Sequence, residues 1–144
     1  MWLLYSTLAS AFWGITYSLN EQLYKHISFL SSLVISSALC TVVFLIVALT
    51  NGSLQKDVPT LVSNNAALTL ALAGAVALIV AEVFIGLSIT SKNATLAGLI
   101  EISYPIFIIL FSYLIFRESH LNLGTILGGV LVFSGIASIY LFNR

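Results

Sequence analysis

Charged residues are scarce in this chain of 144 residues, because only 7% of its positions are Asp, Glu, Lys or Arg. Hydrophobic residues make up 60% of the chain instead, and its mean hydropathy is +1.11. A water-soluble domain of this size could not hide so much apolar surface. The composition therefore excludes a soluble fold and places the chain in a lipid bilayer.

Cysteine is almost absent as well, since Cys40 is the single one, and one chain therefore cannot form a disulfide, a cysteine metal cluster or a redox pair. The sequence also lacks Cys/His clusters, metal-ligand spacings and nucleophile motifs, and both histidines, His26 and His120, lie at predicted helix ends. We therefore expect no enzyme, no catalytic residue, no metal site and no cofactor. We also expect no nucleic-acid partner.

Long apolar stretches are what the chain has in abundance. About 20 apolar residues in an α-helix cover a hydrocarbon core about 30 Å thick. No alternating barrel pattern is visible, so each span must satisfy its backbone hydrogen bonds as a helix, and the predicted fold class is an all-α membrane protein. We expect one five-helix domain over residues 1–144, with spans at about 2–24, 29–49, 66–89, 94–116 and 124–142.

The longest break between spans, residues 50–65, holds the turn formers Asn51-Gly52, Pro59 and Asn64-Asn65. These residue types predict turns rather than a folded domain outside the membrane.

Basic residues are almost evenly divided between the two sides of the membrane in the predicted topology. After five crossings, Lys56 and Arg117 lie on the side of the N-terminus, while Lys25, Lys92 and Arg144 lie on the other side. Lys and Arg near span ends set the direction of insertion, so this balance would permit insertion both ways, that is, a dual topology. The alternative is that five basic residues are too few to decide, and that one loop dominates.

Two short runs carry a pattern that is typical of one transporter family. The first run lies in the first span and reads Ala9-Ser10-Ala11-Phe12-Trp13-Gly14. The second run extends over the last two spans and comprises Tyr104-Pro105-Ile106-Phe107, Leu110, Leu114, Glu118, Gly124, Gly128-Gly129 and Gly135. A proline early in the fourth helix, a terminal Glu and a glycine-rich fifth helix resemble the EamA-type repeat of the drug/metabolite transporter superfamily. The resemblance covers the whole chain.

The resemblance implies a carrier that exports or exchanges small metabolites or drugs by alternating access, with possible coupling to protons. Such carriers usually hold two inverted five-helix repeats around a site near the membrane midplane, whereas this chain carries one repeat. It therefore implies a dimer of half-size chains in the plasma membrane. The charge balance favours an antiparallel homodimer, and a heterodimer with a second half-size chain is an alternative. A membrane accessory or scaffold subunit that transports nothing is a further alternative.

Two carboxylates lie inside predicted spans, namely Glu82 and Glu101, each nine to ten residues from the centre of the Ser91-Lys92 turn. At about 1.5 Å per residue, both lie roughly 13 Å below that turn, where a carboxylate costs several kcal/mol unless it is protonated, paired or in water. If both face inward, repulsion and desolvation would favour protonation of at least one, which predicts a proton or cation site. The alternative is that Glu82 hydrogen-bonds a neighbouring hydroxyl group, such as that of Ser88 or Tyr104, or that one acid stays neutral and packs.

Pro105 lies four residues after Glu101, where it removes a helical hydrogen-bond donor and predicts a kink in the fourth span.

A polar and aromatic face on the first span predicts contacts with a solute. Its residues recur at helical spacings of three and four: Ser6, Ser10, Trp13, Tyr17 and Asn20. Trp13 and Tyr17 could stack on a solute or hydrogen-bond it, although aromatic packing is the alternative. The predicted substrate contacts are Trp13, Tyr17, Asn20 and Tyr104, and the two acids favour a cationic or zwitterionic solute.

Small residues predict where helices approach closely in lipid. They are Ser10 and Gly14 in the first span and Gly124 and Gly128 in the last. The last span is our candidate for contact between two copies, and packing within one copy is the alternative.

Overall fold

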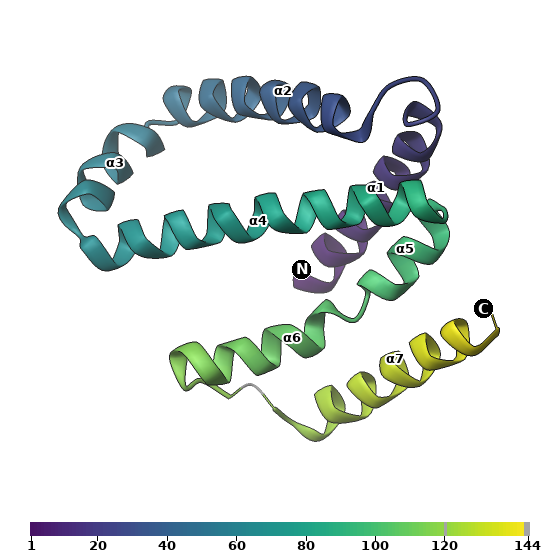
Figure 1. Cartoon of the computed structure of the whole chain (residues 1–144). Helices are drawn as coiled ribbons and strands as arrows, with labels where there is room; N and C mark the ends of the chain where they lie inside the picture. The colour runs from purple at the N-terminus through teal and green to yellow at the C-terminus, as the bar shows by residue number, and fades with distance from the viewer. Residues whose placement is uncertain (120, 143–144) are drawn as a thin grey trace. The chain divides into compact units, whose positions relative to one another are not determined.

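The structure, a computed structural model, describes residues 1–119 and 121–142. His120 and Arg144, which entered the predictions above, lie outside the described residues. Most of the described residues are helical and none lies in a strand, which confirms the predicted all-α class. In chain order the elements are α1 (Trp2–Leu23), α2 (Phe29–Thr50), α3 (Ser53–Ser63), α4 (Asn65–Ser91), α5 (Ala94–Glu101), α6 (Tyr104–Phe111), the π-helical turn η1 (Ser112–Phe116) and α7 (Leu123–Phe142) (Figure 1).

Four helical segments are long and apolar enough to cross a membrane. They match the last four predicted spans to within two residues at each end: Phe29–Thr50, Asn65–Ser91, Ala94–Phe116 and Leu123–Phe142. Helix α1 begins and ends almost where the first span was predicted, but it is not among the four. The count of five spans is therefore confirmed for four, and the crossing by α1 stays a prediction.

Helix α1 is less apolar because serine and threonine interrupt its sequence. Their hydroxyl groups nevertheless donate to carbonyl oxygens four residues earlier, as Ser10 Oγ does to Ser6 O over 3.0 Å and Thr16 Oγ1 does to Phe12 O over 2.9 Å. A hydroxyl that bonds within its own helix leaves no unsatisfied donor for lipid. Membrane insertion of α1 is thus compatible with its polar composition.

The break between α2 and α4 holds the helix α3, which corrects the prediction of turns alone. The turn-forming residues lie at its two ends, where Gly52 adopts a positive φ of 75° and Asn64 Oδ1 accepts hydrogen bonds from the first turn of α4. Pro59 lies inside α3 rather than in a turn. Helix α3 has an apolar side, formed at helical spacing by Leu54, Val58 and residues 61–62, which the prediction of turns did not take into account.

The helices group into two compact units. One unit comprises Met1–Ser18 and Ser91–Arg144, so it contains most of α1 with α5, α6, η1 and α7. The other comprises Leu19–Thr90, which is the end of α1 with α2, α3 and α4.

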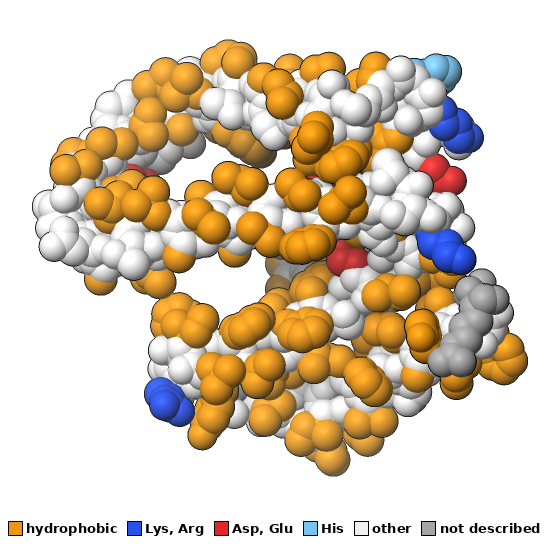
Figure 2. Space-filling view, in the orientation of Figure 1, with side chains coloured by type: hydrophobic (Ala, Val, Ile, Leu, Met, Phe, Trp, Pro, Cys, Tyr) orange, Lys and Arg blue, Asp and Glu red, His pale blue; other side chains and the backbone are white. Residues whose placement is uncertain are grey.

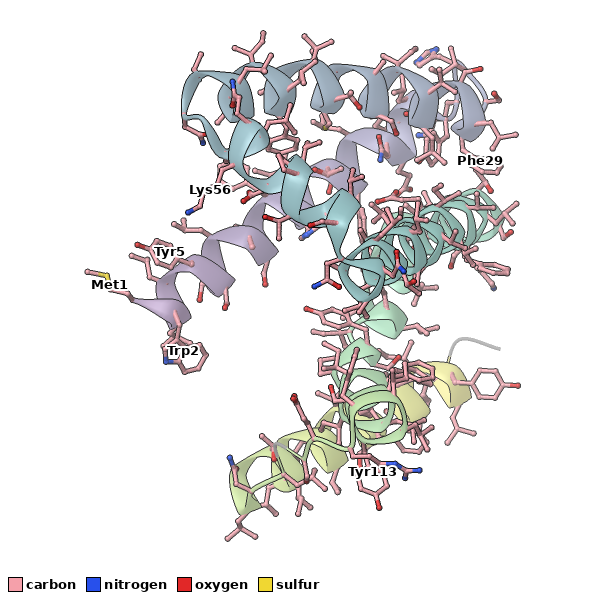
Figure 3. All side chains as sticks on the ribbon, turned by 90° about the vertical axis from the view of Figure 1, so that its left-hand side faces the viewer. Met1, Trp2, Tyr5, Phe29, Lys56 and Tyr113 are labelled. Carbon is pink, nitrogen blue, oxygen red and sulfur yellow. The ribbon has the colours of Figure 1, made fainter. Side chains whose placement is uncertain are left out.

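Few side chains are buried by the chain alone. The buried apolar residues are Ile89, Ala94 and Ala97, and Ser32 is the buried polar one. Hydrophobic side chains cover much of the visible face of the helices (Figure 2), and in a turned view Trp2 and Tyr5 project outward from the start of α1 (Figure 3). Lipid or further helices must therefore cover most of the apolar surface.

In the second unit, the start of α2 packs against α4 at one point. The Phe29 ring lies directly against the backbone of Gly86, which is buried. Tyr24 meets the same ring edge-on, with 6.3 Å between the ring centroids. Ser32, one turn after Phe29, is only 2% exposed.

Candidate functional site

Tyr17 of α1 reaches the last residue of α5. Its hydroxyl group donates to Glu101 Oε2 over 2.5 Å, and both side chains are half-buried. Tyr17 precedes the end of α1 at Leu23 by six positions, and Glu101 follows the start of α5 at Ala94 by seven. At about 1.5 Å per residue, each lies roughly 10 Å from its helix end, which is inside the expected hydrocarbon.

Small residues of α5 make room for the Tyr17 ring. A Cβ atom placed on Gly98 would lie 3.4 Å from Tyr17 Cδ2, so the ring packs against the α5 backbone one turn before Glu101. Ala94 and Ala97 on the same helix are buried. A small residue at position 98 therefore leaves the tyrosine room to extend along α5 to the carboxylate.

The helix breaks immediately after Glu101. Ile102 and Ser103 form a turn in which the Ser103 N–H donates to Ile100 O over 3.1 Å. Pro105 is the second residue of α6, and it has no N–H to donate to the carbonyl group of Glu101 four residues earlier. The predicted fourth span is thus two helices, α5 and α6, with the carboxylate at their junction.

The far end of this span is also irregular. It closes with the π-helical turn η1, after which Arg117 adopts a positive φ of 59°. The Arg117 guanidinium lies over the Tyr113 ring, 5.8 Å from its centroid, and Tyr113 is labelled in Figure 3.

Trp13 extends the site along α1. Its ring centroid lies 5.7 Å from that of Tyr17, the two planes are tilted by 54°, and Trp13 is 50% exposed. Indole and phenol faces attract cations through their ring quadrupoles. Trp13, Tyr17 and Glu101, here called the α1–α5 cluster, therefore combine two aromatic faces with one carboxylate.

The other predicted solute contacts lie outside this cluster. Asn20 is half-buried and belongs to the second unit, and Tyr104 is the first residue of α6 with its side chain 57% exposed. Among the described residues, no group of three or more His, Cys, Asp or Glu side chains could hold a metal ion.

Glu82 has a separate environment in the second unit. It is half-buried in α4, near Tyr24, which lies in the turn after the end of α1. Burial raises the pKa of the Tyr24 hydroxyl, and the negative charge of Glu82 adds to this effect. Glu82 and Glu101 belong to different units, so their matched depth stays a prediction.

At the glycines that were predicted to pack against another helix, the described part of the chain places no other helix. No described atom lies within 4 Å of a Cβ placed on Gly14 or Gly128, and near Gly124 the side chain of Asn122 lies at 3.2 Å. Gly86 and Gly98 do meet aromatic rings, and sequence reasoning missed both. The spacing of four between Ala94 and Gly98 was a signal that could have found the second.

The profile of the EamA-like transporter family matches residues 1–141. No curated protein matches the chain, and no solved structure matches it. The match covers almost the entire sequence, and it agrees with the resemblance carried by the runs around Trp13 and Pro105. Members of this family move small molecules across membranes. This chain therefore belongs to the EamA-like transporter family, as an integral membrane protein that crosses the bilayer several times.

Proposed function

We propose that the chain transports a small solute through a site centred on Glu101, and that two antiparallel copies form the complete carrier. The observation that carries this proposal is the hydrogen bond from Tyr17 to Glu101 at the junction of two half-helices. Carboxylates inside membranes are costly and are kept where they act. Broken helices near the membrane midplane are places where transporters bind solutes.

Each residue of the site has a proposed role. Trp13 and Tyr17 contact the solute through their rings, with Asn20 and Tyr104 as outer contacts. Glu101 binds a cationic or zwitterionic solute as a carboxylate, and on the return step of the transport cycle it carries a proton in place of the solute. Because one carboxylate cannot hold both at once, proton and solute would cross in exchange.

Glu82 is proposed as the second proton or cation site. Glu82 is half-buried in α4 and lies near the Tyr24 hydroxyl, which supports a polar environment. It belongs to the second unit, whereas Glu101 belongs to the first.

Transport by the reconstituted chain tests the role of Glu101. In proteoliposomes with an acidic lumen, we expect the protein to drive uptake of choline, a small organic cation. Glu101→Gln should abolish the dependence of uptake on the proton gradient, because the amide cannot exchange a proton. Glu21→Gln, which changes an acid near the end of α1, should leave uptake unchanged. Equal uptake by Glu101→Gln and the wild type, or no uptake by either, would contradict the assignment.

An antiparallel dimer is supported by two features of the chain. Lys and Arg are balanced between the two sides of the membrane, so neither orientation is strongly favoured. The chain also buries few apolar side chains, and Gly14 and Gly128 are open to a neighbouring helix. Because lipid gives helices no hydrophobic drive to associate, close approach at such glycines is how a second copy would bind, and α7 is the proposed contact.

Orientation-biased variants test the dimer. Thr60→Lys with Ser119→Lys should hold the N-terminus in the cytoplasm, and His26→Lys with Ser91→Lys should place it outside. A reporter fused after Arg144 should detect both faces for the wild type and one face for each variant. Each biased variant should lose transport alone, and their co-expression should restore it. Full transport by one biased variant alone would contradict the antiparallel arrangement.

A further inference from the structure

We propose that the Tyr17 hydroxyl is the resident occupant of the Glu101 carboxylate when neither solute nor proton is bound, and that a small residue at position 98 lets the hydroxyl reach it. An organic cation then enters the site by exchange with this hydroxyl group. The inference rests on the proposed function and adds how the site selects its solute. Tyr17 therefore competes with the solute for the Glu101 carboxylate, and its ring also contacts the bound solute.

The charge of Glu101 explains why a cation wins the exchange. Among residues 1–119 and 121–142, no Lys, Arg or His forms an ion pair with Glu101, and its hydrogen-bond donor is the neutral phenol of Tyr17. A hydrogen bond to a carboxylate is strong, but a neutral donor leaves the negative charge uncompensated in a medium of low dielectric constant. A neutral solute with one hydroxyl group would merely replace one such bond by another, and an anion would be repelled. A cation alone gains both the bond and the charge pairing.

The aromatic rings provide the place for the rest of the cation. Trp13 lies one turn before Tyr17 on α1, and half of its surface is accessible. A primary ammonium group, or the hydroxyl group of choline next to its quaternary nitrogen, can replace the Tyr17 hydroxyl as the donor to Glu101. The cationic head would then lie beside the phenol ring and within reach of the indole face. Such faces stabilise desolvated cations.

Gly98 is the positioning residue because of its distance from the ring. A Cβ at this position would lie 3.4 Å from Tyr17 Cδ2, which is an ordinary van der Waals contact. Alanine is therefore tolerated, and the hydroxyl keeps its reach. Valine adds methyl groups one bond further out, inside the space of the ring, so Gly98→Val should push the phenol away from Glu101. Gly98→Ala therefore tests the loss of glycine alone, and Gly98→Val tests whether the Tyr17 hydroxyl still reaches Glu101.

Carbodiimide labelling measures occupancy of the carboxylate without a known solute. The protein in phosphatidylglycerol nanodiscs would be treated with dicyclohexylcarbodiimide, which modifies carboxyl groups within membranes, and labelling would be followed by mass spectrometry. Glu101 should react several-fold faster in Tyr17→Phe and in Gly98→Val than in the wild type and Gly98→Ala. Glu82 in the same molecules should react at one rate throughout, which controls for folding and reagent access. Tyr17→Phe keeps the ring, so it carries the test if Gly98→Val does not fold.

Choline then tests the exchange. Choline should protect Glu101 at a concentration roughly tenfold lower in Tyr17→Phe than in the wild type, because a hydrogen bond to a charged group no longer competes. Its neutral isostere 3,3-dimethylbutan-1-ol should not protect either protein. Equal labelling of wild type and Tyr17→Phe would overturn the resident hydroxyl. Weaker choline protection in Tyr17→Phe would overturn the competition, and equal protection by the isostere would overturn selection of a cation.

Failure of the proposed function has a different signature. If Glu101→Gln transports like the wild type, Glu101 is not the transport site, whatever the labelling rates show. If transport depends on Glu101 but Tyr17→Phe leaves labelling unchanged, the proposed function stands and the resident hydroxyl is refuted.

Discussion

Replacing Gly86 by alanine should weaken the packing of α2 against α4. A Cβ atom at Gly86 would lie 2.6 Å from Phe29 Cδ2 and 3.3 Å from both Cγ and Cε2, so three atoms of one ring oppose it. The first distance is far inside van der Waals contact, and the Phe29 ring must move. It cannot move freely, because Tyr24 packs against it edge-on.

The expected loss is about 1–3 kcal/mol, which is the usual range for forcing an extra methyl group into a packed site. The same substitution at Gly74, twelve residues earlier in α4, meets no described atom within 4 Å. Alanine has a better helix propensity than glycine by about 1 kcal/mol in water, so Gly74→Ala should be neutral or stabilising. Gly86→Ala and Gly74→Ala are therefore the same chemical change, and they differ in that only the first meets the Phe29 ring.

Reversible unfolding in mixed detergent micelles, followed by circular dichroism, would give the free energy of unfolding of both variants. Phe29→Leu should rescue Gly86→Ala, because a smaller side chain leaves room for the new methyl group, and the coupling between the two substitutions should exceed about 0.5 kcal/mol. If Gly86→Ala is as stable as Gly74→Ala, the contact between α2 and α4 does not have this geometry.

Two further substitutions test the ends of α5. Asn93 Oδ1 accepts a hydrogen bond from the Leu96 N–H over 2.8 Å, so Asn93→Ala should lower the free energy of unfolding by about 1 kcal/mol while Asn93→Asp should not. Equal unfolding midpoints for these two variants would argue against the cap. Pro105→Ala restores an N–H that can bond to the Glu101 carbonyl, so α5 and α6 should join, thermal stability should rise and choline uptake should slow. A less stable Pro105→Ala protein would show that the proline does not cause the break.

Apolar length and local chemistry are enough to predict much of the fold. A chain in lipid must satisfy each backbone group within its own helix, so the lengths of the apolar runs predict the four confirmed spans to within two residues. The kink after Glu101 was predicted from Pro105, because a proline has no N–H to donate to the carbonyl group four positions earlier. The hydroxyl groups of α1 and the short helix α3 show where a count of apolar residues is insufficient.

Which side chains meet across helices depends on contacts that no local pattern contains. Both acids satisfied the same argument from depth, yet Tyr17 bonds Glu101, which is 84 positions away, and Glu82 lies in the other unit. The spacing of Ala94 and Gly98 is a sign of close helix packing, but the aromatic rings that lie against Gly86 and Gly98 are known only from the tertiary structure. The positions of the spans follow from the need of each helix to satisfy its own backbone hydrogen bonds in lipid. The α1–α5 cluster instead exists because two helices that are distant in the sequence pack together and leave room for one tyrosine.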